Sequence, residues 1–450
     1  AVSLRWNITD EPWMEKLRWL NMLSIRPGWG ISGRAPGSEY LYYSKYSNGT
    51  SYNDNGSIYP ANIRLSNLQW EEQQSWNIGF DFGLFDNKLT GDVNIYTQSS
   101  SKLKMPNRAI SSSTGFSALS LQNLGSMRNN GWEFNINANQ IIKKGKFSAS
   151  FNVSFANNRN ELTSMDPTVL ANMNGEFSRS NGSYLSRVQL YNPYGSIYGF
   201  RYKGVYQYSK YSPTEIPGVS GPDAPVARDA EGNVIVDKYG LTVPMVFCYN
   251  NNDNTSIYEF KGGDAKYEDI NHDGNINELD IVYLGSSLPK ITGGCGFRLQ
   301  WGRWTWNNQF NFRYGNKIVN GARMNAESMY NNNNQSTAVN WRWRVEGDIA
   351  PIPRALYQDG YNYLGSDRFV EDGSFIRLNY TQLSYSFDPK SLKQFGIGNI
   401  NLSLTAKNLF CLTNYSGCEP EVMPSRGNVA MDNARTPRPR TYTLRLNIQF

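Results

Sequence analysis

The sequence predicts an all-β protein: a transmembrane antiparallel β-barrel with long loops on one side of the membrane. Three observations support this fold class. Apolar and polar residues alternate along several segments, the connections between these segments are short and long in turn, and aromatic residues make up 14% of the chain. A barrel strand needs only every second residue to be apolar, because one face meets lipid and the other a polar lumen. Tyrosine and tryptophan are typical of the aromatic girdles at the membrane interface.

The alternation begins at the first residues and recurs in chain order. Val2, Leu4 and Trp6 alternate within 1–8, and a second strand is expected over 17–31, after a turn at 11–15. Four hairpins with short polar turns follow. They are expected at 76–84 with 89–95, 132–138 with 147–155, 291–301 with 304–314, and 375–387 with 397–409.

The clearest strand is the last one, 441–450. Its even-numbered residues are all apolar, and its odd-numbered residues from Thr443 to Gln449 are polar. Since side chains of a strand alternate between two faces, one face of this strand suits lipid and the other suits water. We expect Phe450 to lie at the periplasmic rim.

Long connections rich in Asn, Ser, Gly and Tyr separate the hairpins, at 32–74, 99–129, 157–289, 316–372 and 411–440. Short turns that alternate with long loops are typical of outer-membrane barrels, whereas loops of this length are unusual in a soluble sandwich. The expected strands number about eleven, while single-chain bacterial barrels have an even number. A closed barrel therefore requires strands from an N-terminal partner.

Composition excludes several other classes of protein. No apolar run approaches the ~20 residues of a membrane-spanning helix. The net charge is +6 without a marked Lys/Arg cluster, which disfavours nucleic-acid binding. His272 is the one histidine of the chain, so His-based catalytic triads and multi-histidine metal sites are excluded. Four cysteines are too few for a disulfide scaffold, and whether Cys411 and Cys418 pair stays open.

Several motifs, taken in order along nearly the whole chain, resemble the SusC/RagA family of TonB-dependent outer-membrane transporters. They are LQWE at 68–71, WNIGFD at 76–81, NGWE at 130–133, DRFVEDGSFIRL at 367–378, KNLF at 407–410, YSG at 415–417, PE at 420–421 and PRTY at 439–442. The resemblance implies a 22-stranded plugged barrel. Residues 1–450 would be its C-terminal half, with the plug and the N-terminal strands absent from this chain.

The resemblance also implies a function and partners. The chain would be a non-enzymatic part of a Gram-negative outer-membrane importer of oligosaccharides or peptides. A SusD-like surface lipoprotein would form its lid, and the TonB–ExbB–ExbD complex would act through the plug half. A dimer of transporter–lid pairs is an assembly that the resemblance allows. The alternative from the residues alone is a secreted or surface-attached glycan-binding β protein, which would not depend on detergent.

One motif suggests a metal site. Residues 269–280 match D-x-[DN]-x-[DN]-G with an acid at position 12. In such a loop a structural Ca²⁺ would bind the side chains of Asp269, Asn271 and Asp273, the carbonyl of Asn275 and the carboxylate of Asp280. The alternative is an Asp/Asn-Gly turn without metal. His272 is expected to point into solvent.

No catalytic residue is assigned, and the substrate-binding residues stay unknown. The acid pairs Glu71/Glu72 and Glu419/Glu421 would suit a glycosidase by residue type alone, but solvated loop acids are the better interpretation. Loop tyrosines could stack on a sugar or peptide, or could pack within the loops. They are Tyr40, Tyr42, Tyr43, Tyr46, Tyr191, Tyr194 and Tyr198.

Overall fold

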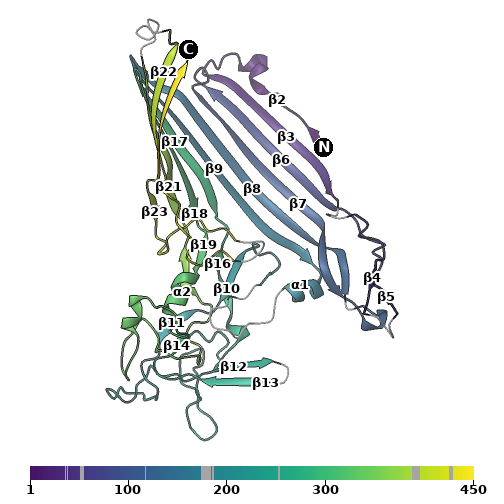
Figure 1. Ribbon diagram of the computed structural model, residues 1–450, viewed down its shortest axis with the longest axis vertical. Coiled ribbons are helices and arrows are strands. Elements are labelled where there is room, and N and C mark those ends of the chain that lie inside the picture. Colours follow the sequence, from purple (N-terminus) through teal and green to yellow (C-terminus); the bar gives the residue numbers. More distant parts are fainter. Residues whose placement is uncertain are drawn as a thin grey trace.

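The computed structural model describes residues 1–35, 37, 39–50, 55–116, 118–173, 184, 187–251, 254–387, 396–424 and 429–449. One large, curved antiparallel sheet dominates these residues, with loops gathered at one end of it (Figure 1). Its strands are β1 Val2–Ser3, β2 Trp6–Asn7, β3 Leu20–Arg34, β6 Glu71–Leu84, β7 Leu89–Ala109, β8 Ala118–Lys144, β9 Phe147–Met165, β17 Ile291–Trp301, β18 Trp304–Tyr314, β21 Phe375–Ser386, β22 Asn399–Lys407, β23 Cys411–Thr413 and β25 Thr441–Gln449.

The order of the strands in the sheet follows their order in the chain: β1-β3-β6-β7-β8-β9-β17-β18-β21-β22-β25. The eleven strands of this path confirm the expected count and every expected hairpin. The short strand β2 also pairs with β3, so the expected strand 1–8 is present in two pieces. Strand β23 pairs with residues 375–377 of β21, next to the part of β21 that pairs with β22. Phe450 and part of the turn between β21 and β22 lie outside the described residues.

The prediction that residues 99–129 form a loop is wrong. Strands β7 and β8 remain paired to their ends, where Ala109 lies opposite Ala118. Apolar alternation fades in this region although main-chain pairing continues. A ribbon that projects beyond the lipid has water on both faces, so its side chains need no apolar face while its main-chain groups still need partners.

Other elements lie between the long strands. The remaining strands are β4 Tyr46–Asn48, β5 Ile58–Pro60, β10 Ser196–Gly199, β11 Tyr202–Val205, β12 Val246–Asn251, β13 Asn254–Glu259, β14 Ala265–Tyr267, β15 Asn275–Ile276, β16 Val282–Ser286, β19 Lys317–Asn320, β20 Val370–Asp372 and β24 Met431–Asp432. The helices are η1 Ile8–Asp10, η2 Pro12–Met14, α1 Pro167–Met173, η3 Ser112–Thr114, η4 Glu278–Asp280, α2 Gly321–Glu327, η5 Thr337–Trp341 and η6 Asp367–Phe369. Across the described residues, no helix combines the length and apolar character needed to cross a membrane.

One face of the large sheet carries a continuous row of exposed apolar side chains, which we call the apolar face. Cross-strand pairing links its members directly: Leu446 lies opposite Leu402, and Leu404 opposite Leu383. Its exposed members are Trp76, Ile78, Ile95, Trp132, Phe151, Trp301, Trp304, Trp306, Leu383, Leu404, Leu444 and Leu446. An apolar surface of this extent is costly in water, so the face suits contact with lipid.

The main buried core is not in the sheet but among the loops. Tyr198, Phe200, Phe247, Phe260 and Tyr267 are almost wholly buried there and form an aromatic core together with Met245, Ile276 and Leu364. Apart from Leu364, these residues lie in or directly beside the short strands β10, β12, β13, β14 and β15. We call this unit, built around the aromatic core, the loop domain.

Candidate functional site

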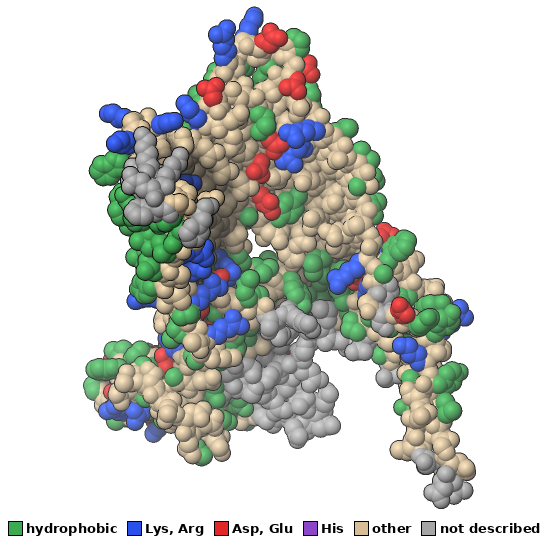
Figure 2. All heavy atoms as spheres, turned by 45° about the horizontal axis from the view of Figure 1, so that its top comes forward, with side chains coloured by type: hydrophobic (Ala, Val, Ile, Leu, Met, Phe, Trp, Pro, Cys, Tyr) green, Lys and Arg blue, Asp and Glu red, His purple; other side chains and the backbone are tan. Residues whose placement is uncertain are grey.

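The polar face of the sheet carries a charged network. The guanidinium of Arg26 on β3 donates to both carboxylate oxygens of Asp81 on β6, at 2.7 and 2.6 Å, and the Ser24 hydroxyl donates to Asp81 at 2.9 Å. On the next strands, the amides of Asn94 and Asn135 donate to Asp92. In Figure 2 charged side chains lie in the middle of the hollowed face of the sheet. This face is therefore lined by fixed, paired polar groups.

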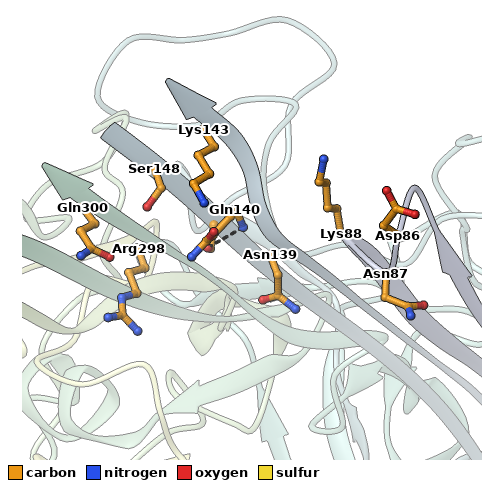
Figure 3. A pocket seen from close by; sticks show the side chains of 10 residues that line it. Asp86, Asn87, Lys88, Asn139, Gln140, Lys143, Ser148, Arg298 and Gln300 are labelled. Atoms are coloured by element: carbon orange, nitrogen blue, oxygen red, sulfur yellow. Dashed lines mark hydrogen bonds between the residues drawn. The ribbon is translucent and has the colours of Figure 1, made fainter. Parts of the chain in front are cut away.

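A pocket of about 640 Å³ lies on this face at the end of the sheet that carries the short turns, and we call it the turn-end pocket. Its charged lining residues are Lys88, Lys143, Arg298 and Asp86, so cations predominate. Figure 3 shows Gln140, Lys143, Ser148 and Arg298 gathered on the neighbouring strands β8, β9 and β17, with Asp86, Asn87 and Lys88 on the adjacent hairpin turn. The Asn139 main-chain N–H donates to the Lys88 carbonyl at 2.7 Å, which ties the two groups together.

A second pocket, of about 580 Å³, lies at the opposite end, where the strands enter the loops. Its walls come from the loop end of β9, the segment at 191–193, strand β16 and the start of β19. The lining combines aromatic, amide and cationic groups, including Tyr191, Tyr283, Asn192, Arg159 and Lys317. Aromatic faces and amide groups are the side chains that recognise a sugar or a peptide backbone. We call it the loop-end pocket.

The tyrosines that the sequence singles out divide into two groups. Tyr198 is buried in the aromatic core, where its hydroxyl contacts Asn192 and Gln189, so it packs and does not bind ligand. Tyr191 is exposed and lines the loop-end pocket. Tyr40, Tyr42, Tyr43 and Tyr46 are exposed beside the hairpin β4–β5, and the rings of Tyr42 and Tyr43 lie 4.1 Å apart. Tyr194 is half-buried.

The structure places the residues of the expected calcium loop in one tight turn between β14 and η4. Asp269 is buried, whereas Asn271, His272 and Asp273 are exposed. Both carboxylate oxygens of Asp280 accept main-chain N–H groups, from Ile270 at 2.8 Å and from Asn277 at 2.9 Å. Asp280 therefore closes the loop and caps η4.

The sequence of the chain is similar to a family model and to several receptors of known class. A family model described as "TonB dependent receptor-like, beta-barrel" matches residues 1–220. A TonB-dependent receptor of Formosa agariphila is 28% identical over 465 residues, which cover all of this chain and 42% of the relative. The TonB-dependent receptor SusC of Bacteroides thetaiotaomicron is 26% identical over 473 residues, covering 100% of this chain and 40% of SusC.

The solved structure of the RagAB peptide transporter superposes on the whole chain with a TM-score of 0.72, at 19% identity and over 43% of that chain. In sequence and fold the chain is similar to TonB-dependent receptor β-barrels of the SusC/RagA type. The receptor barrel lies in the outer membrane, and its apolar face is the lipid-facing one. The chain spans about two fifths of the length of these relatives.

Both acid pairs named from the sequence are engaged by cationic side chains. The Lys102 ammonium lies 2.5 Å from Glu72, and the Lys104 ammonium 3.8 Å from Glu71. Glu419 is buried and bonded to the guanidinium of Arg377. The interpretation as a solvated loop acid is wrong for Glu419, because the fold brings the guanidinium of Arg377 on β21 against it.

The cysteine question also has an answer in the structure. Cys411 and Cys418 are both free thiols. Cys295 lies within β17, opposite Val153 and Phe310, and acts as a small apolar residue of the sheet. The side chain of Cys248 lies outside the described residues.

Glu371 on β20 holds together loop segments at the loop end of the large sheet. Its carboxylate accepts the main-chain N–H of Ser416 at 2.9 Å and the Ser416 hydroxyl at 2.8 Å, and it receives the Arg323 guanidinium at 3.1 Å. Burial acts to raise the pKa of Glu371, but these hydrogen bonds outweigh burial, so its pKa lies below the ordinary value of 4.5.

This shift predicts a pH dependence. A carboxyl whose folded-state pKa is lowered stabilises the fold above its unfolded pKa and loses this contribution as the pH falls through the folded value. We expect the protection of the 411–417 amides, measured against their intrinsic exchange rates at each pH, to fall as the pH drops below 4.5. Glu371→Gln should show fast exchange already at neutral pH, whereas Glu278→Gln, at an exposed acid, should match the wild type. A Glu371→Gln profile with the wild-type pH dependence would contradict this assignment.

Sequence reasoning missed the Arg26–Asp81 network and the turn-end pocket. Their members lie on neighbouring strands but far apart in sequence, with Arg26 and Asp81 separated by 55 positions, and they alternate with apolar residues, so no local motif marks them. Charged residues at the polar positions of expected strands were the available signal, because a charge there must face the lumen.

Proposed function

We propose that this chain forms a wall section of a TonB-dependent importer that carries oligosaccharides or peptides across the outer membrane. The observation that carries the proposal is the pairing of a continuous apolar face with a polar face that holds fixed ion pairs. A sheet with lipid on one side and a hydrated passage on the other requires this arrangement.

The edges of the sheet support the proposal that further strands complete the barrel. Among the described residues β25 pairs with β22 and with no second strand, although it is nine residues long. An unpaired strand edge is not tolerated in lipid, because its N–H and C=O groups would lack partners. We propose that β25 and the β1–β3 edge pair with strands outside this chain. The 22-stranded class of plugged transporters would then be completed by about eleven more.

The plug would fill the hollow and transmit energy from TonB–ExbB–ExbD. Its contact surface would include the turn-end pocket with Lys88, Lys143 and Arg298, which favours an acidic segment. At the other end, a SusD-like lipoprotein would cover the loop domain and the exposed β4–β5 hairpin. RagAB, which shares this fold, is described as a peptide transporter, and this supports peptides as one of the two proposed ligand classes. The loop-end pocket offers aromatic and amide groups for either one.

The test uses the complete receptor, purified in detergent together with whatever lipoprotein accompanies it. Native mass spectrometry of the complex identifies the partner, and binding of defined oligosaccharides and peptides separates the two ligand classes. We expect Tyr191→Ala, in the loop-end pocket, to weaken ligand binding about tenfold, consistent with the 1–3 kcal/mol typical of one aromatic stacking contact. Tyr239→Ala, at an exposed tyrosine away from the pocket, should leave binding unchanged.

Uptake by whole cells completes the test. It should stop when the proton gradient is dissipated, since the proposed transport depends on TonB. A receptor that stays soluble and monomeric without detergent would overturn the proposal in favour of a surface glycan-binding protein. Uptake that continues without the gradient would overturn the proposal that import depends on TonB.

A further inference from the structure

The loop domain contains a turn, residues 269–280, that the transport proposal does not use. We call it the acidic loop. It lies against the aromatic core: Ile276 within it is wholly buried, and the Gly274 carbonyl accepts the Val246 main-chain N–H at 3.1 Å. A Cβ on Gly274 would lie 2.8 Å from the Ala227 side chain, so the turn packs closely on its neighbours. The acidic loop therefore packs directly on the core of the loop domain.

The acidic loop buries a carboxylate oxygen without a partner. Asp269 is 8% exposed; its Oδ2 accepts the Gly274 N–H at 2.8 Å, and its Oδ1 is enclosed and receives no hydrogen bond. Within the described parts of the chain, no ion pair neutralises Asp269, Asp273 or Asp280. A buried, charged oxygen without a partner is costly and rare in folded proteins. A cation beside Asp269 Oδ1 would remove this cost.

Further oxygen donors lie around the same turn. The Asn271 side chain donates to Asp273 Oδ2 at 2.8 Å, and Asp273 Oδ1 accepts the Asn275 N–H at 2.8 Å. These contacts hold the side chains at 269, 271 and 273 on one turn. The left-handed conformations of His272 and Gly274, with φ of 58° and 79°, make the turn tight. The donors are therefore side-chain carboxylate and amide oxygens, together with the Asn275 carbonyl.

The donor set selects the kind of metal. Among the described residues, no three His, Cys, Asp or Glu side chains come together as a metal cluster. A zinc site is disfavoured, since it needs nitrogen or sulfur ligands in a closed set. Calcium accepts mixed carboxylate, amide, carbonyl and water oxygens. Asp280 is buried and both its oxygens accept main-chain N–H groups, whereas Asp273 is exposed and one of its oxygens bonds only a side chain. Asp280 is therefore left out of the ligand set and treated as a positioning residue for the loop.

We propose that the acidic loop binds a calcium ion through Asp269 Oδ1, Asn271, Asp273 and the Asn275 carbonyl, and that the ion clips the loop to the aromatic core. Water would complete the coordination. With two carboxylates in the set, the affinity falls in the range of extracellular modules, about 10⁻⁴ to 10⁻³ M. The site lies in the loop domain, apart from both pockets, so the proposal is independent of transport.

The experiment measures calcium binding to the complete receptor in detergent, after removal of bound metal. Calcium is titrated while hydrogen exchange is followed in peptides that cover residues 265–283. We expect the wild type to gain protection there, with saturation in the stated range and no equal response to magnesium. Asp269→Asn should weaken calcium binding at least tenfold. Asp229→Asn, at an exposed turn of the same loop domain, should bind calcium as the wild type does.

The asparagine variant separates loss of metal from loss of fold. The Asn side chain keeps an acceptor for the Gly274 N–H, so calcium-free Asp269→Asn should exchange like the calcium-free wild type. Asp273→Asn gives a second variant at an exposed position, with the same expected loss. If calcium produces no protection in the wild type, or if Asp269→Asn and Asp273→Asn bind as tightly as the wild type, the proposal is wrong.

Discussion

Arginine at both Leu444 and Leu446 is expected to abolish stable insertion of the receptor barrel. These side chains lie on the apolar face of β25 and are 71% and 56% exposed. A charge on the lipid face of a barrel costs about 2–4 kcal/mol at the membrane midplane and less near the interface. Two charges on one strand would remove a large part of a typical folding free energy. Outer-membrane fractions should contain little folded, heat-modifiable receptor.

The matched control places the same two charges on the other face of the same strand. Thr443→Arg with Asn447→Arg adds arginine at polar positions, opposite Thr405 and Asn401 of β22. Since this face meets the hydrated lumen, assembly should be close to that of the wild type. Equal loss in both double variants would show that the strand tolerates no charge at all, and would contradict the assignment of its faces.

Removal of Arg377 is expected to destabilise the loop end of the sheet by about 3–5 kcal/mol, the cost of removing one partner of a buried ion pair. The Arg377 side chain on β21 is almost wholly enclosed; it bonds Glu419 and lies 3.9 Å from Glu421. Arg377→Ala leaves the Glu419 carboxylate buried without this cation. Limited proteolysis of the 411–424 segment and the unfolding midpoint in denaturant both report the loss.

Two further variants identify the cause. Arg201→Ala breaks a half-exposed pair with Glu268 and should cost less than about 1 kcal/mol. Arg377→Met combined with Glu419→Gln removes both charges and should recover most of the stability lost in Arg377→Ala. If the double variant is as unstable as the single one, packing of the arginine and not the ion pair holds this region.

The strands were predictable because lipid imposes a simple rule on them. Wherever β-strands cross the bilayer, every second side chain must be apolar, so the hairpin 304–314 with 291–301 is visible from residue types alone. The rule stops where the strand leaves the lipid, and 99–129 was therefore expected as a loop although β7 and β8 continue through it. The acid at 269 was also found from a local pattern, since a tight turn brings together residues adjacent in the chain.

The sequence alone thus determined the fold class, the family, the strand count and the two faces of β25. Each of these rests on local periodicity or on motifs read in order. Only the tertiary structure decided that Asp280 caps η4, that Asp269 keeps an enclosed oxygen without a partner, and that Glu419 lies against Arg377. The physical reason is that burial and ion pairing depend on the packing of the whole chain: Arg377 and Glu419 are 42 positions apart and meet only when it folds. Even within the 269–280 turn, the sequence pattern does not say which oxygens the main chain takes.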